Sequence, residues 1–107
     1  MIAYNFAEKF SKIPGPRRKE IGPYSGELFR EEVLREWFDK NQEVEFDIDG
    51  VIMNFGPSFL SEAFGKMAKD IGSEEKFFSI IHVRNNSDKN KHFKELLHKY
   101  VKIALSK

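Results

Sequence analysis

The spacing of the hydrophobic residues changes repeatedly along the chain, from the two-residue repeat of strands to the 3.6-residue repeat of helices. The segment Glu43–Asp49 alternates strictly, with apolar side chains on one face and acidic ones on the other. Such alternation predicts a strand with one buried face. Ile2–Phe6 and the nearly continuous apolar run Phe77–Val83 are also expected to be strands.

Three other segments have the spacing of amphipathic helices. The first is expected to begin after Ser25, a good N-cap, and to run to about Lys40. The second begins at Pro57, because proline is favoured at the first helical position, and stops at Gly72. The third covers roughly Asp88–Leu105. Strands and helices that alternate in this way predict an α/β domain with a small, mostly parallel sheet of about four strands and three main helices.

The dipeptide Asp49-Gly50 leaves two interpretations of the residues after it. It is a common turn in hairpins, which would make Val51–Phe55 a strand paired with the one before. Alternatively, Val51–Asn54 only connects the strand to the next helix. The second interpretation is preferred, because the helical pattern after Pro57 is strong and the strand after Gly50 would be short.

With 107 residues, the chain is expected to form a single domain, 1–107. One stretch inside it, residues 13–26, holds three of the four prolines and three of the seven glycines. Prolines disfavour helix in themselves and in the residue before them, so this stretch is predicted to be a loop. A loop of this length in a small domain is usually functional or flexible.

The composition argues against several classes of function. The chain has no cysteine, which excludes disulfide scaffolds, thiol nucleophiles and cysteine-based metal sites. His82, His92 and His98 have neither metal-ligand nor triad spacing, and the acidic residues of Glu43–Asp49, Asp47 among them, are expected to form a solvated strand face. No catalytic residue, metal or cofactor is therefore expected, and the chain is predicted not to be an enzyme.

The charge and hydropathy patterns bear on partners and location. Eighteen basic and seventeen acidic residues leave a net charge of +1, which argues against nucleic acid as a partner. The segment Arg84–Lys107 is locally basic, but its aromatic residues lie on the apolar stripe of the helix rather than among the lysines. A secretory signal and an 18-residue apolar run are both lacking, so no membrane span and a cytoplasmic location are expected.

Two stretches carry a family resemblance. One is Gly22–Glu32, GPYSGELFREE, which opens the first helix; the other combines Asp47–Val51, DIDGV, with Ser58–Gly65, SFLSEAFG. Together they resemble the bacterial STAS-like domains of unknown function, a family similar to the STAS domains of anti-sigma-factor antagonists and of sulfate-transporter tails. The resemblance covers nearly the whole chain, from about Ile2 to Tyr100.

This resemblance implies a compact α/β module in bacterial signalling that binds proteins or a small ligand and is often controlled by phosphorylation. In the anti-sigma antagonists the phosphate goes on a serine of an Asp-Ser-Ser turn at the start of the second helix. Here the turn departs from that pattern and reads Gly56-Pro57-Ser58, so Pro57 occupies the matching position. Ser58 is then either the candidate phosphoacceptor or simply a residue that favours helix initiation. The resemblance also implies a protein partner of the histidine-kinase-like, ATP-binding kind, and a homodimer stays open.

Partner binding is expected around the start of the second helix. The candidate residues are Phe55, Pro57, Phe59 and Ser61. One of the two phenylalanines is expected to be an exposed apolar anchor, unless both belong to the core. The predicted function is thus a non-enzymatic regulatory or protein-interaction module of the STAS-like type.

The alternative prediction is a receptor for a small ligand or anion. The loop before the first helix could hold an anion between basic side chains and the free N–H groups of the helix start. Its spacing matches neither a P-loop nor a dinucleotide-binding motif, and a solvated loop is the simpler interpretation. The candidate anion-binding residues are Arg17, Arg18, Gly22, Ser25 and Gly26.

Overall fold

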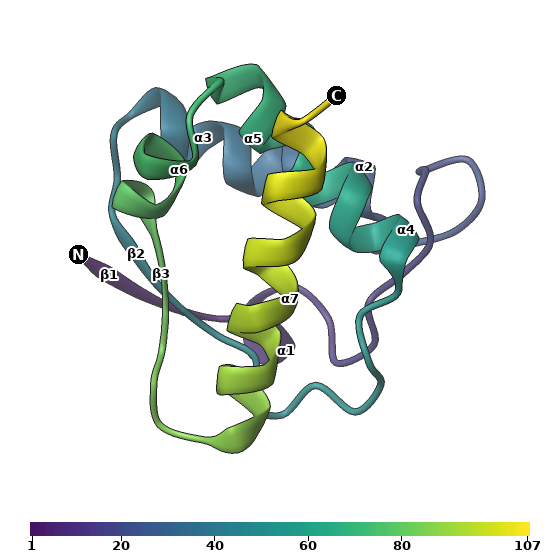
Figure 1. Ribbon diagram of the computed structural model, residues 1–107. Helices are drawn as coiled ribbons and strands as arrows, with labels where there is room; N and C mark the ends of the chain where they lie inside the picture. The colour runs from purple at the N-terminus through teal and green to yellow at the C-terminus, as the bar shows by residue number, and fades with distance from the viewer.

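In the computed structural model, which describes residues 1–107, three short strands form one parallel sheet (Figure 1). They are β1 (Ile2–Asn5), β2 (Val44–Asp47) and β3 (Ile81–Val83), and they lie in the order β1-β2-β3. Tyr4 pairs with Phe46, and Phe46 pairs with Val83. The α/β class and the mostly parallel sheet are confirmed, with three strands in place of about four.

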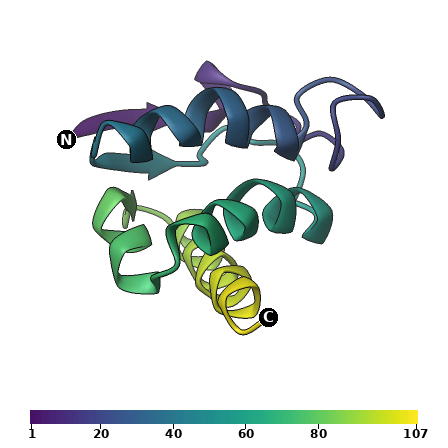
Figure 2. The same cartoon turned by 90° about the horizontal axis from the view of Figure 1, so that it is seen from above.

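Two long helices connect the strands, and each contains one π-helical turn. The first runs from Gly26 to Asp39 through α2 (Gly26–Phe29), the π-helical turn η1 (Arg30–Leu34) and α3 (Arg35–Asp39). The second runs from Pro57 to Ile71 through α4 (Pro57–Leu60), the π-helical turn η2 (Ser61–Gly65) and α5 (Lys66–Ile71). Figure 2 shows the first helix beside β1 and β2 and the second helix between it and the C-terminal helix.

The ends of the long helices agree with the sequence patterns. The Ser25 hydroxyl accepts a hydrogen bond from the Leu28 N–H and so caps α2. Pro57 takes the first position of α4, and Gly72, with φ of +78°, ends α5 in the left-handed conformation. The C-terminal helix α7 (Asp88–Leu105) is capped by Ser87. All three main helices were therefore predicted correctly from their caps and apolar stripes.

The prediction of a strand over Phe77–Val83 is wrong for its first half. A short helix, α6 (Glu74–Ile80), occupies that half, and only Ile81–Val83 enters the sheet. Ser73 caps α6 by accepting from the Lys76 N–H, and two glutamates in the first turn stabilise it further. A continuous apolar run has no periodicity that separates a buried helix from a buried strand. Here the N-cap residue Ser73, just before the run, favours the helix.

The residues after Asp49 connect β2 to α4 and form no hairpin, which confirms the preferred interpretation. Gly50 has φ of +97°, a backbone conformation that glycine adopts without strain. The remaining helix, α1 (Phe6–Lys9), is a single turn that follows β1 and is capped by Asn5. None of the helices combines the length and apolar character that a membrane crossing requires.

Aromatic side chains fill the space between the sheet and the helices. The Phe46 ring lies centrally, 5.8 Å from the Tyr4 ring, 5.7 Å from the Phe64 ring and 5.6 Å from the Phe93 ring between centroids. Seven phenylalanines are almost completely buried. The opposite face of the sheet carries Ala3, Glu45 and His82, which pair with one another in register and are half or fully exposed. The core therefore lies on one face of the sheet.

Candidate functional site

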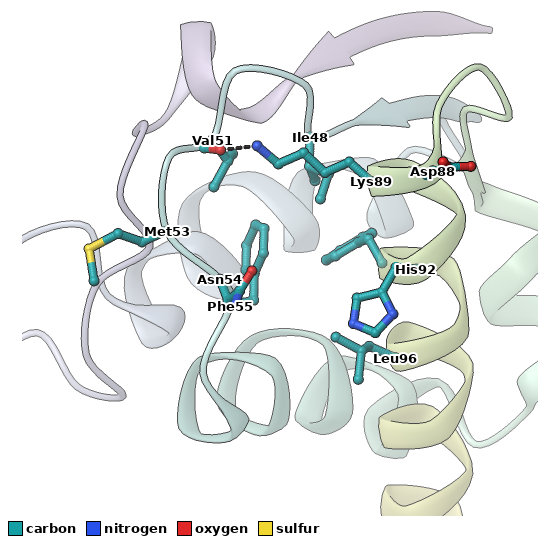
Figure 3. Close-up of a pocket in the computed structure, with 10 residues that line it drawn as sticks. Ile48, Val51, Met53, Asn54, Phe55, Asp88, Lys89, His92 and Leu96 are labelled. Atoms are coloured by element: carbon teal, nitrogen blue, oxygen red, sulfur yellow. Dashed lines mark hydrogen bonds between the residues drawn. The ribbon is translucent and has the colours of Figure 1, made fainter.

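A pocket opens between the loop after β2 and the first half of α7 (Figure 3). Its volume is about 330 Å³. The loop contributes Ile48, Val51, Met53, Asn54 and Phe55, and α7 contributes Asp88, Lys89, His92, Phe93 and Leu96. Six of these ten residues are hydrophobic, so the pocket suits an apolar group with polar atoms at its edge.

Two apolar side chains of the same loop are exposed to solvent. Ile52 is 68% exposed and Met53 is 58% exposed, although most apolar residues of the chain are in the core. In Figure 3 the Met53 side chain lies on the outer side of the loop, at the edge of the pocket. Together with the pocket, they give this loop an accessible apolar surface.

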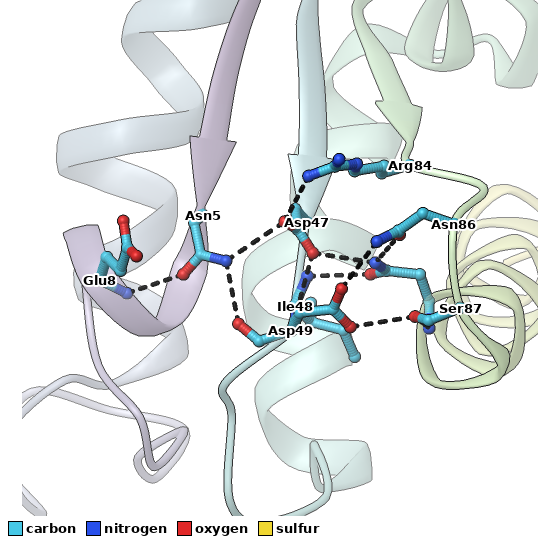
Figure 4. Close-up of polar contacts among 9 residues, drawn as sticks. Asn5, Glu8, Asp47, Ile48, Asp49, Arg84, Asn86 and Ser87 are labelled. Atoms are coloured by element: carbon cyan, nitrogen blue, oxygen red, sulfur yellow. Dashed lines mark hydrogen bonds and ion pairs between the residues drawn. The ribbon is translucent and has the colours of Figure 1, made fainter.

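A network of polar groups, with Asp47 and Asn90 buried at its centre, holds the base of this loop (Figure 4). Each strand of the sheet has a polar residue of the network at its carboxyl end: Asn5 and Asp47 are the last residues of β1 and β2, and Arg84 directly follows β3. The carboxyl ends of parallel strands meet at one edge of a sheet, so these residues come together although they are far apart in sequence. Ligand sites of open α/β domains typically form at this edge.

Asp47 lies at the centre of the network and is buried. Its Oδ1 accepts hydrogen bonds from the Asp49 N–H and from Asn90 Nδ2, both at 2.9 Å. Its Oδ2 accepts from Asn5 Nδ2 and from Arg84 Nη1, both at 3.3 Å. Burial by itself raises the pKa of Asp47, but these hydrogen bonds and the nearby arginine outweigh it and hold the pKa below the ordinary value.

The buried side chain of Asn90 links the loop to α7. Its Oδ1 accepts from the Ile48 N–H at 2.9 Å, and its Nδ2 donates to Asp47 and to Asn86. Asp49 accepts from the Asn86 amide at 2.9 Å and from the Ser87 hydroxyl at 3.0 Å. The start of α7 is therefore tied to the end of β2 by side chains that are all hydrogen-bonded.

The expectation of a solvated acidic strand face is wrong for Asp47. This residue ends a strand between two others, so its carboxylate faces donors from both neighbours rather than water. The Asp47 carboxylate accepts four hydrogen bonds from within the chain, so its role is structural. No group of three or more His, Asp or Glu side chains is placed to hold a metal ion.

The predicted partner-binding residues lie at the start of the second long helix and just before it. Pro57 and Ser58 are exposed, and Ser61 is half-buried. Phe55 is 7% exposed and Phe59 is 1% exposed, so neither is an exposed anchor. Both rings pack against Phe6, which is why the core interpretation of these two phenylalanines holds. The accessible apolar residues of this region are Ile52 and Met53 instead.

At the start of the first helix, where the alternative prediction places an anion, the backbone N–H groups are engaged within the chain. The N–H groups of Gly26 and Glu27 donate to the carbonyls of Pro16 and Arg17, at 2.8 and 3.0 Å. Ser25 is buried, and its hydroxyl oxygen accepts a hydrogen bond from the Leu28 N–H. These N–H groups of the helix start are therefore already paired within the chain. Arg17 and Arg18 are exposed, and Gly22 is half-buried. The loop thus folds back on its own helix.

The sequence analysis missed most of the residues that shape this site. Asn5, Asn86 and Asn90 gave no signal, because a lone asparagine outside a known motif is read as a turn or cap residue. A usable signal was a polar residue at or near the carboxyl end of each predicted strand, namely Asn5, Asp47 and Arg84, since parallel strands bring such positions together. Ile52 and Met53 belong to the predicted connection Val51–Asn54.

One comparison with known proteins gives a match. A family model described as a STAS-like domain of unknown function matches residues 25–91, more than half of the chain. The matched range begins at the cap of α2, includes β2 with the loop after it, and ends in the first turn of α7. No curated protein and no solved structure matches the chain.

Proposed function

The chain belongs to the family of STAS-like domains of unknown function, and from this membership and the geometry of the strand ends we propose that it is a non-enzymatic protein-interaction module. Its partner surface comprises residues 50–58 and the pocket between them and α7. The observation that carries the proposal is the exposure of Ile52 and Met53 on a loop whose base is fixed by buried hydrogen bonds.

A fixed loop is suited to binding because its backbone is already ordered. The Val51 carbonyl accepts a hydrogen bond from Lys89 Nζ, and the Ile52 N–H donates to the Lys12 carbonyl at 2.8 Å. Less conformational entropy is then lost when a partner covers the loop. Exposed apolar groups beside a concave site mark interaction surfaces, with the pocket receiving one apolar side chain of the partner.

Ser58 is the proposed switch of this surface. It is exposed in the first turn of α4, three residues after Phe55, which lines the pocket. A phosphate there would add about 1.5 to 2 negative charges beside the positive end of the helix, which tolerates them. A partner that meets Ser58 uncharged would have to bury that charge unpaired, so binding weakens. Family resemblance favours a histidine-kinase-like regulator as this partner.

The surface is tested with two matched variants. Ile52→Glu places a charge on the proposed surface, whereas Ile21→Glu does so at an equally exposed isoleucine, 67% against 68%, in the 13–26 loop. The wild-type chain, immobilised, captures a partner from a lysate of its native host, and both variants are then titrated with that purified partner. Ile52→Glu should weaken binding at least tenfold and Ile21→Glu should leave it unchanged. Equal affinities for both variants would refute the surface.

The switch is tested in the same titration. Ser58→Glu should weaken binding by about 2–5 kcal/mol, because the partner must bury an unpaired charge. Ser58→Ala should bind like the wild type, and both variants should melt within a few degrees of it. If Ser58→Glu binds as tightly as Ser58→Ala, the surface stands but Ser58 is only the second residue of a helix.

A further inference from the structure

A second concave site lies away from the strand ends, between α5 and the C-terminal half of α7, and it goes beyond the proposed function. Gly65, the last residue of η2, lines this site: a Cβ there would lie 3.5 Å from the Ala104 Cβ, an ordinary contact distance, so the second long helix packs directly against α7 at this point. The pocket beside this contact has a volume of about 210 Å³.

Four of the six polar residues that line this pocket are cationic. Arg17 from the 13–26 loop, Lys66 and Lys69 from α5, and Lys107 after α7 line it. Ser61 and Tyr100 add hydroxyl groups, and no Asp or Glu lines the pocket. A chain whose net charge is only +1 thus gathers four positive side chains around one cavity.

The nearby carboxylates leave most of this charge uncompensated. Lys66 contacts Glu62 at 2.9 Å, but Glu62 is buried and is shared with Arg30 at 2.6 Å. Arg17 and Lys69 form no ion pair. Like charges brought together repel one another, and an anion among them relieves the repulsion.

We propose that this pocket binds a phosphate group of a small molecule or a lipid, held by Arg17, Lys66 and Lys69. These three residues come from two segments, the 13–26 loop and α5, and Arg17 reaches the site because its own carbonyl accepts a hydrogen bond from the Glu27 N–H at the start of α2. The arginine offers a planar fork of donors to the phosphate oxygens, and the lysines act as point charges. Tyr100 and Ile103 provide an apolar wall for the rest of the ligand.

The test is a titration of the full chain with inorganic pyrophosphate at low salt, followed by amide shifts in nuclear magnetic resonance spectra. Arg17→Ala and Lys69→Ala are compared with Lys91→Ala, an exposed lysine of α7 that does not line the pocket. A parallel arm measures sedimentation with vesicles of phosphatidylcholine containing phosphatidylglycerol. The two arms distinguish a soluble phosphate compound from a lipid headgroup.

Saturable binding of either probe, weakened at least fivefold by Arg17→Ala and by Lys69→Ala but not by Lys91→Ala, supports the site. The largest amide shifts should then fall on Ser61, Gly65 and Tyr100. Absence of saturable binding to both probes overturns the proposal. An equal loss in all three variants also overturns it, because it would show a general attraction of anions to the basic surface.

Discussion

At the scale of single residues, the polar side chains of this protein are used mainly to join segments that are distant in sequence. Asp47 and Asn90 are 43 positions apart and share a hydrogen bond in the interior. A buried polar group that loses its partner costs more than the bond itself contributes, so such pairs fix one arrangement of the chain. The hydrophobic pattern placed Phe46 and Ile48 in the core correctly, but it carried no information about which donors Asp47 would meet.

The first residue-scale prediction concerns the Asp47 carboxylate. Asp47→Asn puts an NH2 group where one oxygen now accepts two hydrogen bonds, so donors face donors. The free energy of unfolding should fall by about 1–3 kcal/mol at pH 7. Urea denaturation measures it, with Glu45→Gln on the same strand as the control. Equal losses in the two variants would contradict the central role of Asp47.

Because Asp47 titrates and an asparagine in its place would not, the difference in free energy of unfolding between the wild type and Asp47→Asn should depend on pH. The pKa of Asp47 is lower in the folded protein than its ordinary value of 3.8. The stabilisation that ionised Asp47 gives the fold is therefore complete above the pKa of the unfolded state. It is lost as pH falls through the pKa of the folded state. The stability difference measured at pH 7 should shrink when the urea curves are repeated below pH 3.

A second residue-scale prediction concerns His98, whose ring stacks on Phe78 with centroids 3.8 Å apart. Burial lowers the pKa of His98 below 6.5; Glu74 opposes this shift, and Lys94 and Lys102 add to it. Stability due to the neutral ring is complete above the unfolded pKa and is lost as pH falls through the folded one. Thermal melts between pH 7.5 and pH 5 should show a smaller decline for His98→Gln than for His92→Gln. Identical declines in melting temperature for the two variants would contradict this role of His98.

At the scale of elements, close contact between the two long helices depends on a glycine at the first position of α2. Gly26 packs against the backbone of α4, and an added Cβ would lie 2.9 Å from the Phe59 carbonyl oxygen. The sequence predicted both helices from their caps and stripes, yet it could not show that they cross at Gly26. It also could not separate the helix Glu74–Ile80 from the strand after it, because both lie in one apolar run.

The element-scale prediction compares two glycine substitutions. Gly26→Ala should lower the free energy of unfolding by about 1–3 kcal/mol, because a backbone oxygen cannot move aside. Gly65→Ala should be neutral or stabilise by up to about 1 kcal/mol, because its Cβ would meet Ala104 at an ordinary 3.5 Å and alanine favours helix. Chemical denaturation of both variants checks the order, and a larger loss for Gly65→Ala would contradict it.

At the scale of the whole molecule, one core joins every layer. The Phe46 ring contacts Phe29 and Trp37 of the first long helix, Phe64 of the second and Phe93 of α7. A domain built around one such cluster is expected to unfold in a single cooperative step. The family match and the sequence patterns agree on this architecture, whereas the basic pocket arises only when loop, α5 and α7 are assembled.

The whole-molecule prediction uses the only tryptophan as a probe. Trp37 is buried against Tyr4, so its fluorescence reports on the core, while circular dichroism reports on all helices. The two urea transitions should coincide in the wild type. Phe46→Ala should destabilise by about 3–5 kcal/mol, against less than about 0.5 kcal/mol for Ile2→Ala on exposed β1. Separate transitions for the two probes would show that the domain does not unfold as one unit.

The parallel pairing of the strands also sets the order of events while the chain is being made. At about 5–20 residues per second, β1 leaves the ribosome roughly 2 to 8 seconds before the last residue of its partner β2. Phe93, Leu97 and Val101, which complete the core, emerge later still. Because the Phe46 ring packs against Phe93, the aromatic cluster of the core is completed only after α7 has been made.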